Sequence, residues 1–345
     1  MNIYDLKNYD YMLPNGLIAQ EPIKNRDNSR LLIFDRNSNK IIHDFFYNLH
    51  NYLNEGDVVV LNNTKVIPAR IFGNKIKTNA KIEILLLDNL GEKKWNVMIK
   101  NSRRIKNNDE VIINNDLKLK ILEKKGKEVI VEFNLSNNKL LGKLWDIGIM
   151  PLPPYIKKNK FDLVHKSRYQ TIYAKNPGSK AAPTAGLHFT ENVLDNLKNK
   201  KIKTAEITLH IGLGTFNPVD TRDIRDYKIH KEYFHISNST AAIINNAKQK
   251  NKKVIACGTT SLRVLENSHK NKMIYPQNST TSLYIYPGFK FNITDHLITN
   301  FHLPKTSLYI LVCAFAGIEN IKRCYNEAIE NNYRFYSYGD VMLIK

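Results

Sequence analysis

The sequence has few cysteines and no long apolar run, and each scarcity excludes a class of protein. Cys257, Cys313 and Cys324 are the three cysteines among 345 residues, and no two of them form a CxxC pair. An odd count without paired spacing does not build a disulfide framework, so we expect buried thiols in a reducing compartment. The longest apolar run, Leu308 to Ile318, is too short to span a bilayer. Because the N-terminal residues lack an apolar signal region, we expect a cytoplasmic protein with no membrane partner.

Acidic residues are also scarce, with 32 Asp and Glu against 52 Lys and Arg, and the formal net charge is +20. Such an excess favours a polyanionic partner such as a nucleic acid. Lys, Asn and Ile are abundant throughout, as in proteins from low-GC genomes, so a basic surface without a specific partner is the alternative. The chain has no Walker A motif, no HExxH and no Cys/His metal spacing. His230, Glu232 and His235 lie close together in the sequence, but we expect no metal site.

The order of predicted elements indicates two structural units. Residues 1–63 are predicted to contain a helix near 44–53 and a buried strand at 58–62. Between residues 64 and 155, short β-branched runs alternate with turn signals and show no convincing helix, which favours a small barrel or sandwich. Helix and strand patterns alternate from 156 to 345, as in an α/β domain. We therefore predict a mixed α/β main domain, formed by 1–63 and 156–345, with an inserted small all-β barrel domain at 64–155.

Caps and periodicity place the elements of the second α/β part. Thr190 is the expected N-cap of the helix 191–200, and Ser239 or Thr240 that of the helix 239–250. The remaining predicted helices are 260–268, 305–316 and 320–331, and the predicted strands are 203–210, 253–257 and 341–344.

Four segments have the residue types of a binding site rather than of a core. The first, 169–190, gathers small residues before a helix, and small residues let the backbone approach a ligand. Its candidates are Thr184, Gly186 and His188. The other segments lie at 208–219, 254–266 and 297–312.

The segment 208–219 ends a strand at His210 and continues through Gly212, Gly214 and Thr215. Glycines there allow a sharp turn and let backbone amides face a ligand. The pair lacks the third glycine of a dinucleotide fingerprint, so it is weak evidence alone. A histidine at a strand end is also commonly structural.

In the segment 254–266, a strand leads into Thr259 and Thr260 at a helix start, where hydroxyls and free amides suit a carboxylate or ribose hydroxyls. Arg263 and Glu266 share a helix face, and a surface ion pair beside a good N-cap is the alternative.

The segment 297–312 contributes Asn300 and His302, which alternate on an extended stretch. The chain then closes with a cluster of aromatic residues around Arg334, Tyr338 and Asp340. Aromatic side chains beside an arginine stack on bases in some proteins, and they form core in others.

Taken in order, these motifs resemble the S-adenosylmethionine:tRNA ribosyltransferase-isomerase family of queuosine biosynthesis. The resemblance covers nearly the whole chain, and only the part between residues 74 and 144 matches in pattern alone. Mild departures from the family's pattern are Lys65, Lys180 and Ile229. The motifs that carry the resemblance are DYMLPNGLIAQEP, GDVVVLNNTKVIPARIFG, PLPPYI, GSKAAPTAGLHFT, ITLHIGLGTFNPV, GTTSLRVLE, LITNFHLPKTSL and YRFYSYGDVMLI.

The resemblance implies a tRNA-modifying enzyme with an α/β domain and an inserted β-barrel. Such an enzyme transfers and isomerises the ribosyl moiety of S-adenosylmethionine onto 7-aminomethyl-7-deazaguanine at the tRNA wobble position. The product is epoxyqueuosine in tRNA, and adenine and methionine are released. S-adenosylmethionine is consumed as a substrate, so no separate cofactor is expected. The expected partners are this tRNA and S-adenosylmethionine, and we expect a monomer.

The implied reaction needs a general base at the 5′ carbon beside the sulfonium and a proton donor for the departing adenine. The candidates for these proton transfers are His188, His210 and His302, whose order of action stays open. Glu266 and Asp340 are candidates for the ribose hydroxyls or the substrate amine, and Arg263 for the methionine carboxylate.

Two alternatives come from other functional classes. An RNA methyltransferase would use the same donor and release S-adenosylhomocysteine, but the glycine-rich signature usual after its first strand is missing. A non-catalytic RNA-binding protein would explain the charge but not the site-like segments.

Overall fold

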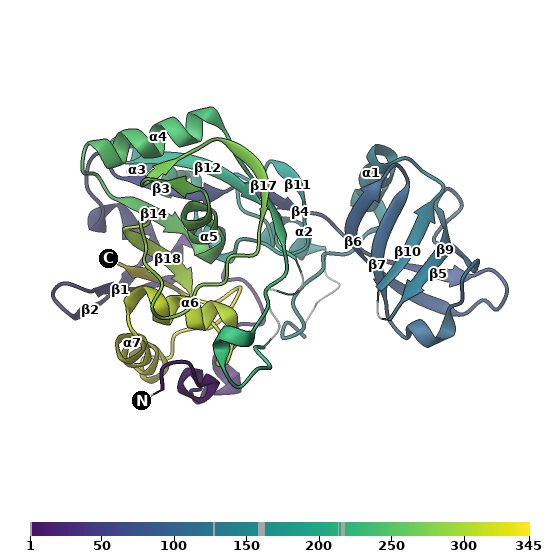
Figure 1. Ribbon diagram of the computed structural model, residues 1–345, viewed down its shortest axis with the longest axis horizontal. Coiled ribbons are helices and arrows are strands. Elements are labelled where there is room, and N and C mark those ends of the chain that lie inside the picture. The colour runs from purple at the N-terminus through teal and green to yellow at the C-terminus, as the bar shows by residue number, and fades with distance from the viewer. Residues whose placement is uncertain (1, 127, 158–162, 213, 215–217) are drawn as a thin grey trace. The chain divides into compact units, whose positions relative to one another are not determined.

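The computed structural model describes residues 2–126, 128–157, 163–212, 214 and 218–345, and the chain separates into two compact units (Figure 1). The first unit comprises Met1–Lys65, Pro153–Lys158 and Arg168–Lys345, and the second comprises Val66–Leu152 and Asn159–Ser167. The first unit is built on a mixed sheet and the second on a closed barrel. The predicted fold class, a mixed α/β domain with an inserted β-barrel, is confirmed.

A nine-stranded sheet forms the centre of the first unit, and its four middle strands are parallel. The neighbouring β19 is antiparallel to β18 and parallel to β1, so β19 and β1 begin at the edge where the middle strands end. Six chain segments therefore meet at one edge of the sheet. In order across the sheet, the strands are β17 (Gln277–Thr281), β13 (Glu232–Ile236), β12 (Lys203–Leu209), β3 (Val58–Asn62), β14 (Val254–Cys257), β18 (His296–Asn300), β19 (Val341–Ile344), β1 (Arg30–Asp35) and β2 (Lys40–Phe45).

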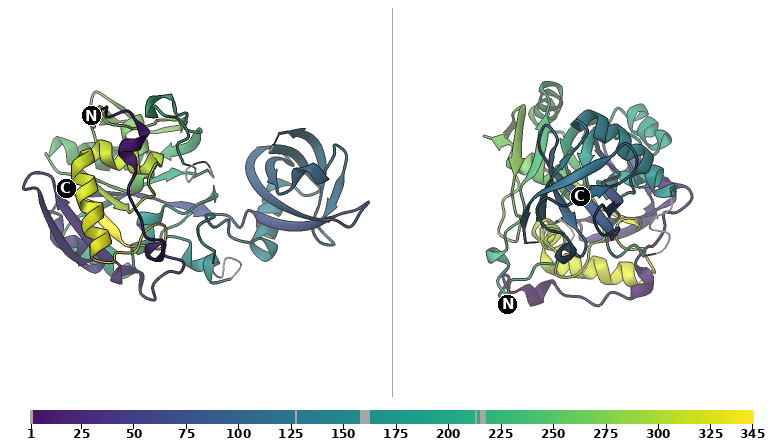
Figure 2. Two further views of the ribbon diagram at one scale, coloured as in Figure 1. Left: turned by 90° about the horizontal axis from the view of Figure 1, so that it is seen from below. Right: turned by 90° about the vertical axis from the view of Figure 1, so that its right-hand side faces the viewer.

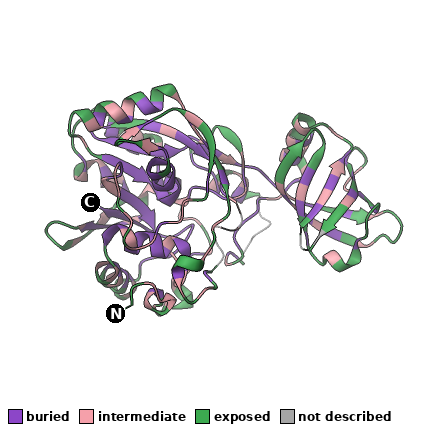
Figure 3. Ribbon diagram, in the orientation of Figure 1, coloured by how far each residue is buried: buried purple, intermediate pink, exposed green. Residues whose placement is uncertain are grey.

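Successive side chains of β3 face opposite sides of the sheet, and their burial shows why this strand lies at the centre. Val58 and Val60 belong to the hydrophobic cluster on one face, and Val59 and Leu61 to the cluster on the other. Burying each such side chain stabilises the fold by about 1.5–3 kcal/mol. A strand covered on both faces needs a continuous apolar run, which is what the sequence VVVL supplies. Three of the four middle strands, β3, β14 and β18, are accordingly buried along nearly their whole length (Figure 3).

Helices cover both faces of this sheet. One cluster includes side chains from α4 (Asn238–Gln249), α5 (Gly258–Asn267), α6 (Ser307–Ala316) and α7 (Ile318–Glu330). The opposite cluster includes α3 (Glu191–Asn199) and the 3₁₀ helix Phe46–Tyr52. Two short ladders lie outside the nine-stranded sheet, β4 (Thr64–Val66) with β11 (Asn176–Ser179) and β15 (His269–Lys270) with β16 (Met273–Ile274).

The second unit is a closed six-stranded barrel with its own core, and Figure 2 shows its strands closing on themselves. Alternate residues of each strand face inward, as Ile82, Ile84 and Leu86 do. The strand order around the barrel is β10 (Glu128–Phe133), β7 (Lys94–Ile99), β6 (Lys81–Gly91), β5 (Arg70–Lys75), β8 (Glu110–Ile112) and β9 (Lys118–Lys125).

The prediction of no helix in the inserted part 64–155 is wrong, because α1 (Asn137–Ile147) follows the last barrel strand. Beyond that part, α2 (Val164–Arg168) follows the proline-rich connector. Leu140 and Leu144 of α1 lie four residues apart and are buried in the barrel core. Only two side chains of this helix are fully buried and its first turn is polar, so its periodicity is weak in the sequence.

Two further expectations are corrected by the structure. The predicted helix near 44–53 is the end of β2 followed by the 3₁₀ helix Phe46–Tyr52. Its buried Phe46 and Leu49 lie three residues apart, which matches the three-residue turn of a 3₁₀ helix. Helix α4 is capped by Ser237, whose hydroxyl accepts a hydrogen bond from the amide of Thr240. The predicted cap of α3 is confirmed, since the Thr190 hydroxyl accepts from the amide of Val193.

The three cysteines are free and buried, as predicted. Burial raises the pKa of both the Cys257 and the Cys324 thiol to about 12, so these thiols are unreactive at neutral pH. None of the helices in the described part of the chain is long and apolar enough to cross a membrane.

Candidate active site

The candidate site lies at the edge of the sheet where the four parallel strands end. Each of these strands passes there into one of the motifs singled out in the sequence. β12 ends before His210, β14 before Gly258, and β18 ends at Asn300. In open α/β sheets, ligands bind in the crevice outside the carboxyl ends of the strands. The convergence of these segments follows from the parallel pairing of the strands.

A cleft of about 650 Å³, including space open to solvent, occupies this edge. Its wall combines apolar groups with hydroxyl groups, and such mixed walls are typical of small-molecule sites. The lining residues are Tyr155, Ala182, Pro183, Thr184, Ala185, Ile211, Gly258, Thr259, Thr260, Thr299, Asn300, Phe301, His302, Leu303, Thr306, Leu308, Tyr336 and Ser337.

Helix α5 begins at this cleft with Gly258, Thr259 and Thr260, all of which line it. Gly258 has φ +88°, a backbone conformation that favours glycine. The N-cap residue Cys257 makes no side-chain hydrogen bond to the first turn. The Thr260 hydroxyl accepts a hydrogen bond from the Asn62 side chain at 3.3 Å, which ties the helix start to the end of β3.

Asn300 connects the cleft to His188. The amide nitrogen of Asn300 donates to the Asp340 carbonyl at 3.2 Å and to His188 Nε2 at 3.0 Å. Because a carbonyl only accepts, this contact fixes which way the amide faces. The Asn300 Oδ1 atom is buried without a hydrogen-bond partner, although its side chain lines the cleft. A buried unpaired acceptor is costly, so this oxygen is suited to a donor group of a ligand.

His188 lies behind Asn300 and is 4% exposed. Its Nε2 accepts from Asn300, so Nδ1 carries the hydrogen and donates to Ser29 Oγ at 2.6 Å. The Ser29 hydroxyl in turn donates to the carbonyl of Arg26. Burial, with a smaller contribution from the charges of Arg26 and Arg334, lowers the pKa of His188 to about 3. The imidazole is therefore neutral at physiological pH and holds the Asn300 amide in place.

His302 is the predicted histidine whose side chain lines the cleft. Its Nε2 lies 2.8 Å from Thr299 Oγ1, and its backbone amide donates to the hydroxyl of Tyr325. Burial lowers the pKa of His302 to about 3. A neutral imidazole of this kind has a lone pair with which to accept a proton at neutral pH.

His210 is not among the residues that line the cleft. Its Nδ1 lies 2.7 Å from Thr64 Oγ1, and its ring stacks on Tyr233 with a centroid separation of 5.7 Å. Burial, together with the charge of Lys180, lowers the pKa of His210 to about 4. The ring also packs against Gly178, where an added Cβ would lie 2.8 Å from the imidazole. These contacts are those of a structural histidine.

Asp340 and Arg334 belong to the turn that precedes β19. The Asp340 carboxylate accepts from the amides of Arg30 and Arg334, at 2.9 and 2.8 Å. Burial raises the pKa of Asp340, although these hydrogen bonds oppose the rise. The Arg334 guanidinium donates to the Glu21 carbonyl, which joins this turn to the N-terminal segment. Tyr338 lines a smaller pocket beside the cleft.

Arg263 and Glu266 do not form the surface ion pair considered as the alternative for them. Both are buried, and the Arg263 guanidinium pairs with Glu232, the middle residue of the 230–235 cluster. Arg263 Nε also donates to the Leu283 carbonyl at 2.9 Å.

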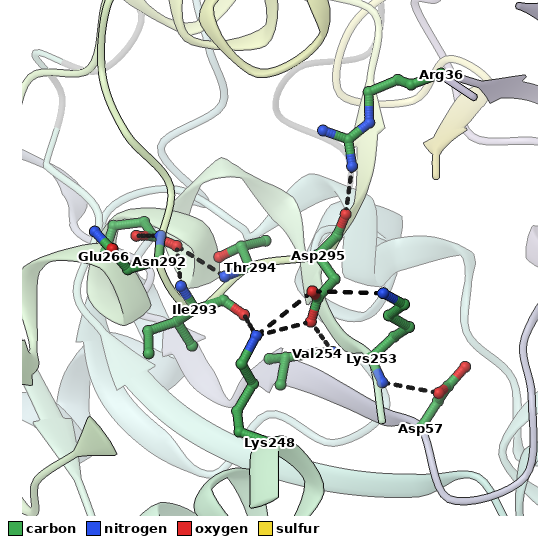
Figure 4. A network of polar contacts seen from close by, with 10 residues as sticks. All are labelled: Arg36, Asp57, Lys248, Lys253, Val254, Glu266, Asn292, Ile293, Thr294 and Asp295. Carbon is green, nitrogen blue, oxygen red and sulfur yellow. Dashed lines mark hydrogen bonds and ion pairs between the residues drawn. The ribbon is translucent and has the colours of Figure 1, made fainter. Parts of the chain in front are cut away.

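The Glu266 carboxylate accepts hydrogen bonds from three consecutive backbone amides, those of Asn292, Ile293 and Thr294 (Figure 4). Neither Arg263 nor Glu266 lines the cleft. The structure thus assigns both side chains to holding segments of the chain together, and we place neither in the candidate site.

The predicted glycines have different surroundings. Gly186 packs tightly, since an added Cβ would lie 2.1 Å from the Tyr173 hydroxyl. The amide of Gly212 donates to the Glu232 carboxylate at 3.0 Å. Gly214 packs against the His230 ring. Thr215 lies outside the described residues.

Sequence reasoning missed several cleft residues, among them Tyr155, Thr299, Tyr336 and Ser337. Tyr155 ends the proline-rich connector, and its hydroxyl is hydrogen-bonded to Ser337. Tyr336 has φ +75°, a backbone strain that marks functional sites but is invisible in the sequence. The density of aromatic residues at 333–338 was the available signal. It did not separate the core residues Tyr333 and Phe335 from those that line the cleft.

Within the described residues, no group of three or more His, Cys, Asp or Glu side chains is arranged to hold a metal ion.

Comparison with known proteins agrees with this geometry. The model of a family described as queuosine biosynthesis protein matches residues 6–344. A relative from Caldanaerobacter subterraneus, named S-adenosylmethionine:tRNA ribosyltransferase-isomerase, is 47% identical over 96% of this chain and 97% of its own. A relative of the same name from Staphylococcus haemolyticus is 44% identical over 99% of both chains.

Among solved structures, the crystal structure of S-adenosylmethionine tRNA ribosyltransferase from Thermotoga maritima is similar, with a TM-score of 0.57 and 32% identity. The match covers 98% of this chain and 100% of that one. The chain belongs to the queuosine biosynthesis protein family.

Proposed function

We propose that this member of the queuosine biosynthesis family is an S-adenosylmethionine:tRNA ribosyltransferase-isomerase. It joins the ribosyl moiety of S-adenosylmethionine to 7-aminomethyl-7-deazaguanine at the tRNA wobble position, giving epoxyqueuosine and releasing adenine and methionine. The observation that carries the proposal is the identity of 44–47% with relatives of that name over nearly the full chain. S-adenosylmethionine is consumed in this reaction, and no separate cofactor takes part.

The cleft at the carboxyl edge of the sheet is the proposed S-adenosylmethionine site. Five threonines line it, and their hydroxyls can bond with ribose hydroxyls. The N-terminal end of α5 carries a partial positive charge and suits the methionine carboxylate. The unpaired Asn300 Oδ1 suits a donor group of the substrate, such as a hydroxyl or an amino group.

His302 is the proposed base at the 5′ carbon. Burial keeps its imidazole neutral, and it lines the cleft, whereas His188 lies behind Asn300 and His210 packs against Thr64 and Tyr233. The adjacent sulfonium makes the 5′ proton more acidic, so a weak base suffices. With so low a pKa the ring is neutral at neutral pH, and its unprotonated nitrogen can take a proton from the substrate. The same imidazole can then deliver that proton to the departing adenine.

The net charge of +20 supports an RNA substrate, because Lys and Arg side chains displace counterions from phosphates. Binding of tRNA should therefore weaken steeply as the salt concentration rises. A flat response to salt would argue against phosphate-dominated binding.

The activity test uses S-adenosylmethionine and tRNA that carries 7-aminomethyl-7-deazaguanine, with chromatographic detection of the small products. Adenine and methionine released together, only with the modified tRNA, would establish ribosyl transfer. S-adenosylhomocysteine would indicate a methyltransferase, and tRNA binding without turnover would indicate a binding protein.

The role of His302 is tested with His302→Gln against His230→Gln, which alters an exposed histidine. The first variant should lose at least about 100-fold in kcat, within the usual contribution of a general base, while the second keeps its turnover. Full activity of His302→Gln would remove this histidine from the chemistry.

A further inference from the structure

A second pocket, of about 270 Å³ including space open to solvent, lies beside the cleft in the α/β unit, and Ser337 lines both. Its wall contains two arginines from distant parts of the sequence, Arg26 and Arg168. His188 closes this pocket on the side toward Asn300. The other lining residues are Pro22, Ile23, Ser29, Leu187 and Tyr338.

Neither arginine makes an ion pair with a carboxylate among the described residues. Arg26 donates to the Gln170 carbonyl at 3.0 Å, and Arg168 donates to the carbonyls of Lys24 and Ile23. These contacts hold both guanidinium groups in place without neutralising either charge. A neutral acceptor leaves most of the electrostatic cost of a partly buried cation uncompensated.

The guanidinium of Arg168 has one more hydrogen-bond donor, which is not used within the described residues. Its Nε is buried and has no hydrogen-bond partner. Arginine presents its donors in a planar fork that matches the oxygens of phosphate and carboxylate groups. A ligand oxygen would satisfy this nitrogen, whereas water has no net charge to offset the two cations.

The charges around the pocket are unbalanced. Burial lowers the pKa of Arg26, and repulsion from Arg168 lowers it further. Arg334 adds positive charge near His188. Asp340, which interacts with Arg334, accepts hydrogen bonds from the backbone amides of Arg30 and Arg334. An anion in the pocket would relieve the repulsion between the two arginines.

We infer that the pocket between Arg26 and Arg168 binds an oxyanion of a substrate, next to the cleft in which the ribosyl donor is placed. This inference rests on the proposed function for the identity of the substrates. Two groups have the required chemistry, a backbone phosphate of the tRNA and the methionine carboxylate of S-adenosylmethionine, which would then lie here rather than at the N-terminal end of α5. Each makes a different prediction for binding.

The experiment compares Arg26→Gln and Arg168→Gln with Arg222→Gln, which removes the same charge from a side chain that is 88% exposed. Affinity for the modified tRNA is measured at several salt concentrations, and affinity for S-adenosylmethionine is measured separately. Both are binding measurements, so they do not depend on turnover. Thermal unfolding of each variant shows that it is folded.

A phosphate in the pocket predicts tRNA binding weakened about tenfold in each pocket variant, with a logarithmic salt slope shallower by roughly 0.7–0.9 and unchanged binding of S-adenosylmethionine. A carboxylate predicts weaker binding of S-adenosylmethionine with an unchanged salt slope for tRNA. Either result supports an oxyanion site and identifies its source.

The inference is overturned if both affinities match the wild type, or if Arg222→Gln produces the same losses. Arg26→Lys is a control for misfolding, because it keeps the positive charge and removes only the planar guanidinium group. It should fall between the wild type and Arg26→Gln. If the wild type binds both substrates but releases no adenine, the proposed activity fails while the oxyanion site can still be judged from the binding data.

Discussion

Acid should destabilise the α/β unit through two histidines, the buried His188 and the half-buried His302. Burial lowers the pKa of His188 and His302 from 6.5 to about 3, so neither takes up a proton in the folded state until the pH is far below neutral. The unfolded chain protonates both near pH 6.5. The unfolded state therefore binds more protons as the pH falls, and the free energy of unfolding decreases.

The size of this effect follows from the two pKa values of each histidine. Each loses about 2 kcal/mol of stabilisation between pH 7 and pH 5, so the pair loses about 4 kcal/mol. Because whole domains are stable by only roughly 5–15 kcal/mol, this loss should be easy to measure. Asp340 acts in the opposite direction, since burial raises its pKa, and single variants are needed to isolate the histidines.

The assay is urea unfolding at pH 7 and pH 5, followed by far-ultraviolet circular dichroism. Fluorescence alone would mislead, because Trp95 and Trp145 are the only tryptophans and both belong to the barrel unit. His188→Gln should remove about half of the combined acid destabilisation, and the exposed control His230→Gln should remove little. An unchanged loss of stability in His188→Gln and His302→Gln would refute the reasoning.

Three further substitutions test how the structure holds the site together, each by denaturant unfolding. Glu266→Ala should lower the free energy of unfolding by about 3 kcal/mol, because three backbone amides lose their acceptor. The affinity of the folded variant for S-adenosylmethionine should stay unchanged, and a weaker affinity would show that Glu266 belongs to the binding site. Glu232→Gln leaves the buried Arg263 without its counter-charge and should cost about 3–5 kcal/mol, whereas a stable variant would mean that Arg263 is neutralised in another way. Gly186→Ala places a methyl group 2.1 Å from the Tyr173 hydroxyl and should cost at least about 1–3 kcal/mol, and a neutral result would show that Tyr173 can move aside.

The fold class could be predicted from the sequence, because the periodicity of apolar residues depends only on neighbours along the chain. The continuous apolar run at Val58–Leu61 predicted a strand covered on both faces, and the strands 58–62 and 341–344 were predicted at their observed bounds. The Thr190 cap and the buried cysteines were predictable for the same reason. Helix α1 was missed because only two of its side chains reach the barrel core.

The sequence also indicated which segments form the site, but not what their side chains do. Small residues and glycines after strands marked the four segments, all of which supply residues that line the cleft. The roles of Arg263 and Glu266 depend on Glu232 and on residues 292–294, which are distant in sequence. No local pattern carries that information.

Tertiary structure alone decided how the histidines differ. All three lie in similar glycine- or proline-containing segments, and each has the same intrinsic pKa. Strand pairing places His302 in the cleft, His188 behind Asn300, and His210 against Thr64 and Tyr233. Burial and hydrogen-bond partners then set their protonation, and both depend on side chains that only the folded sheet brings together.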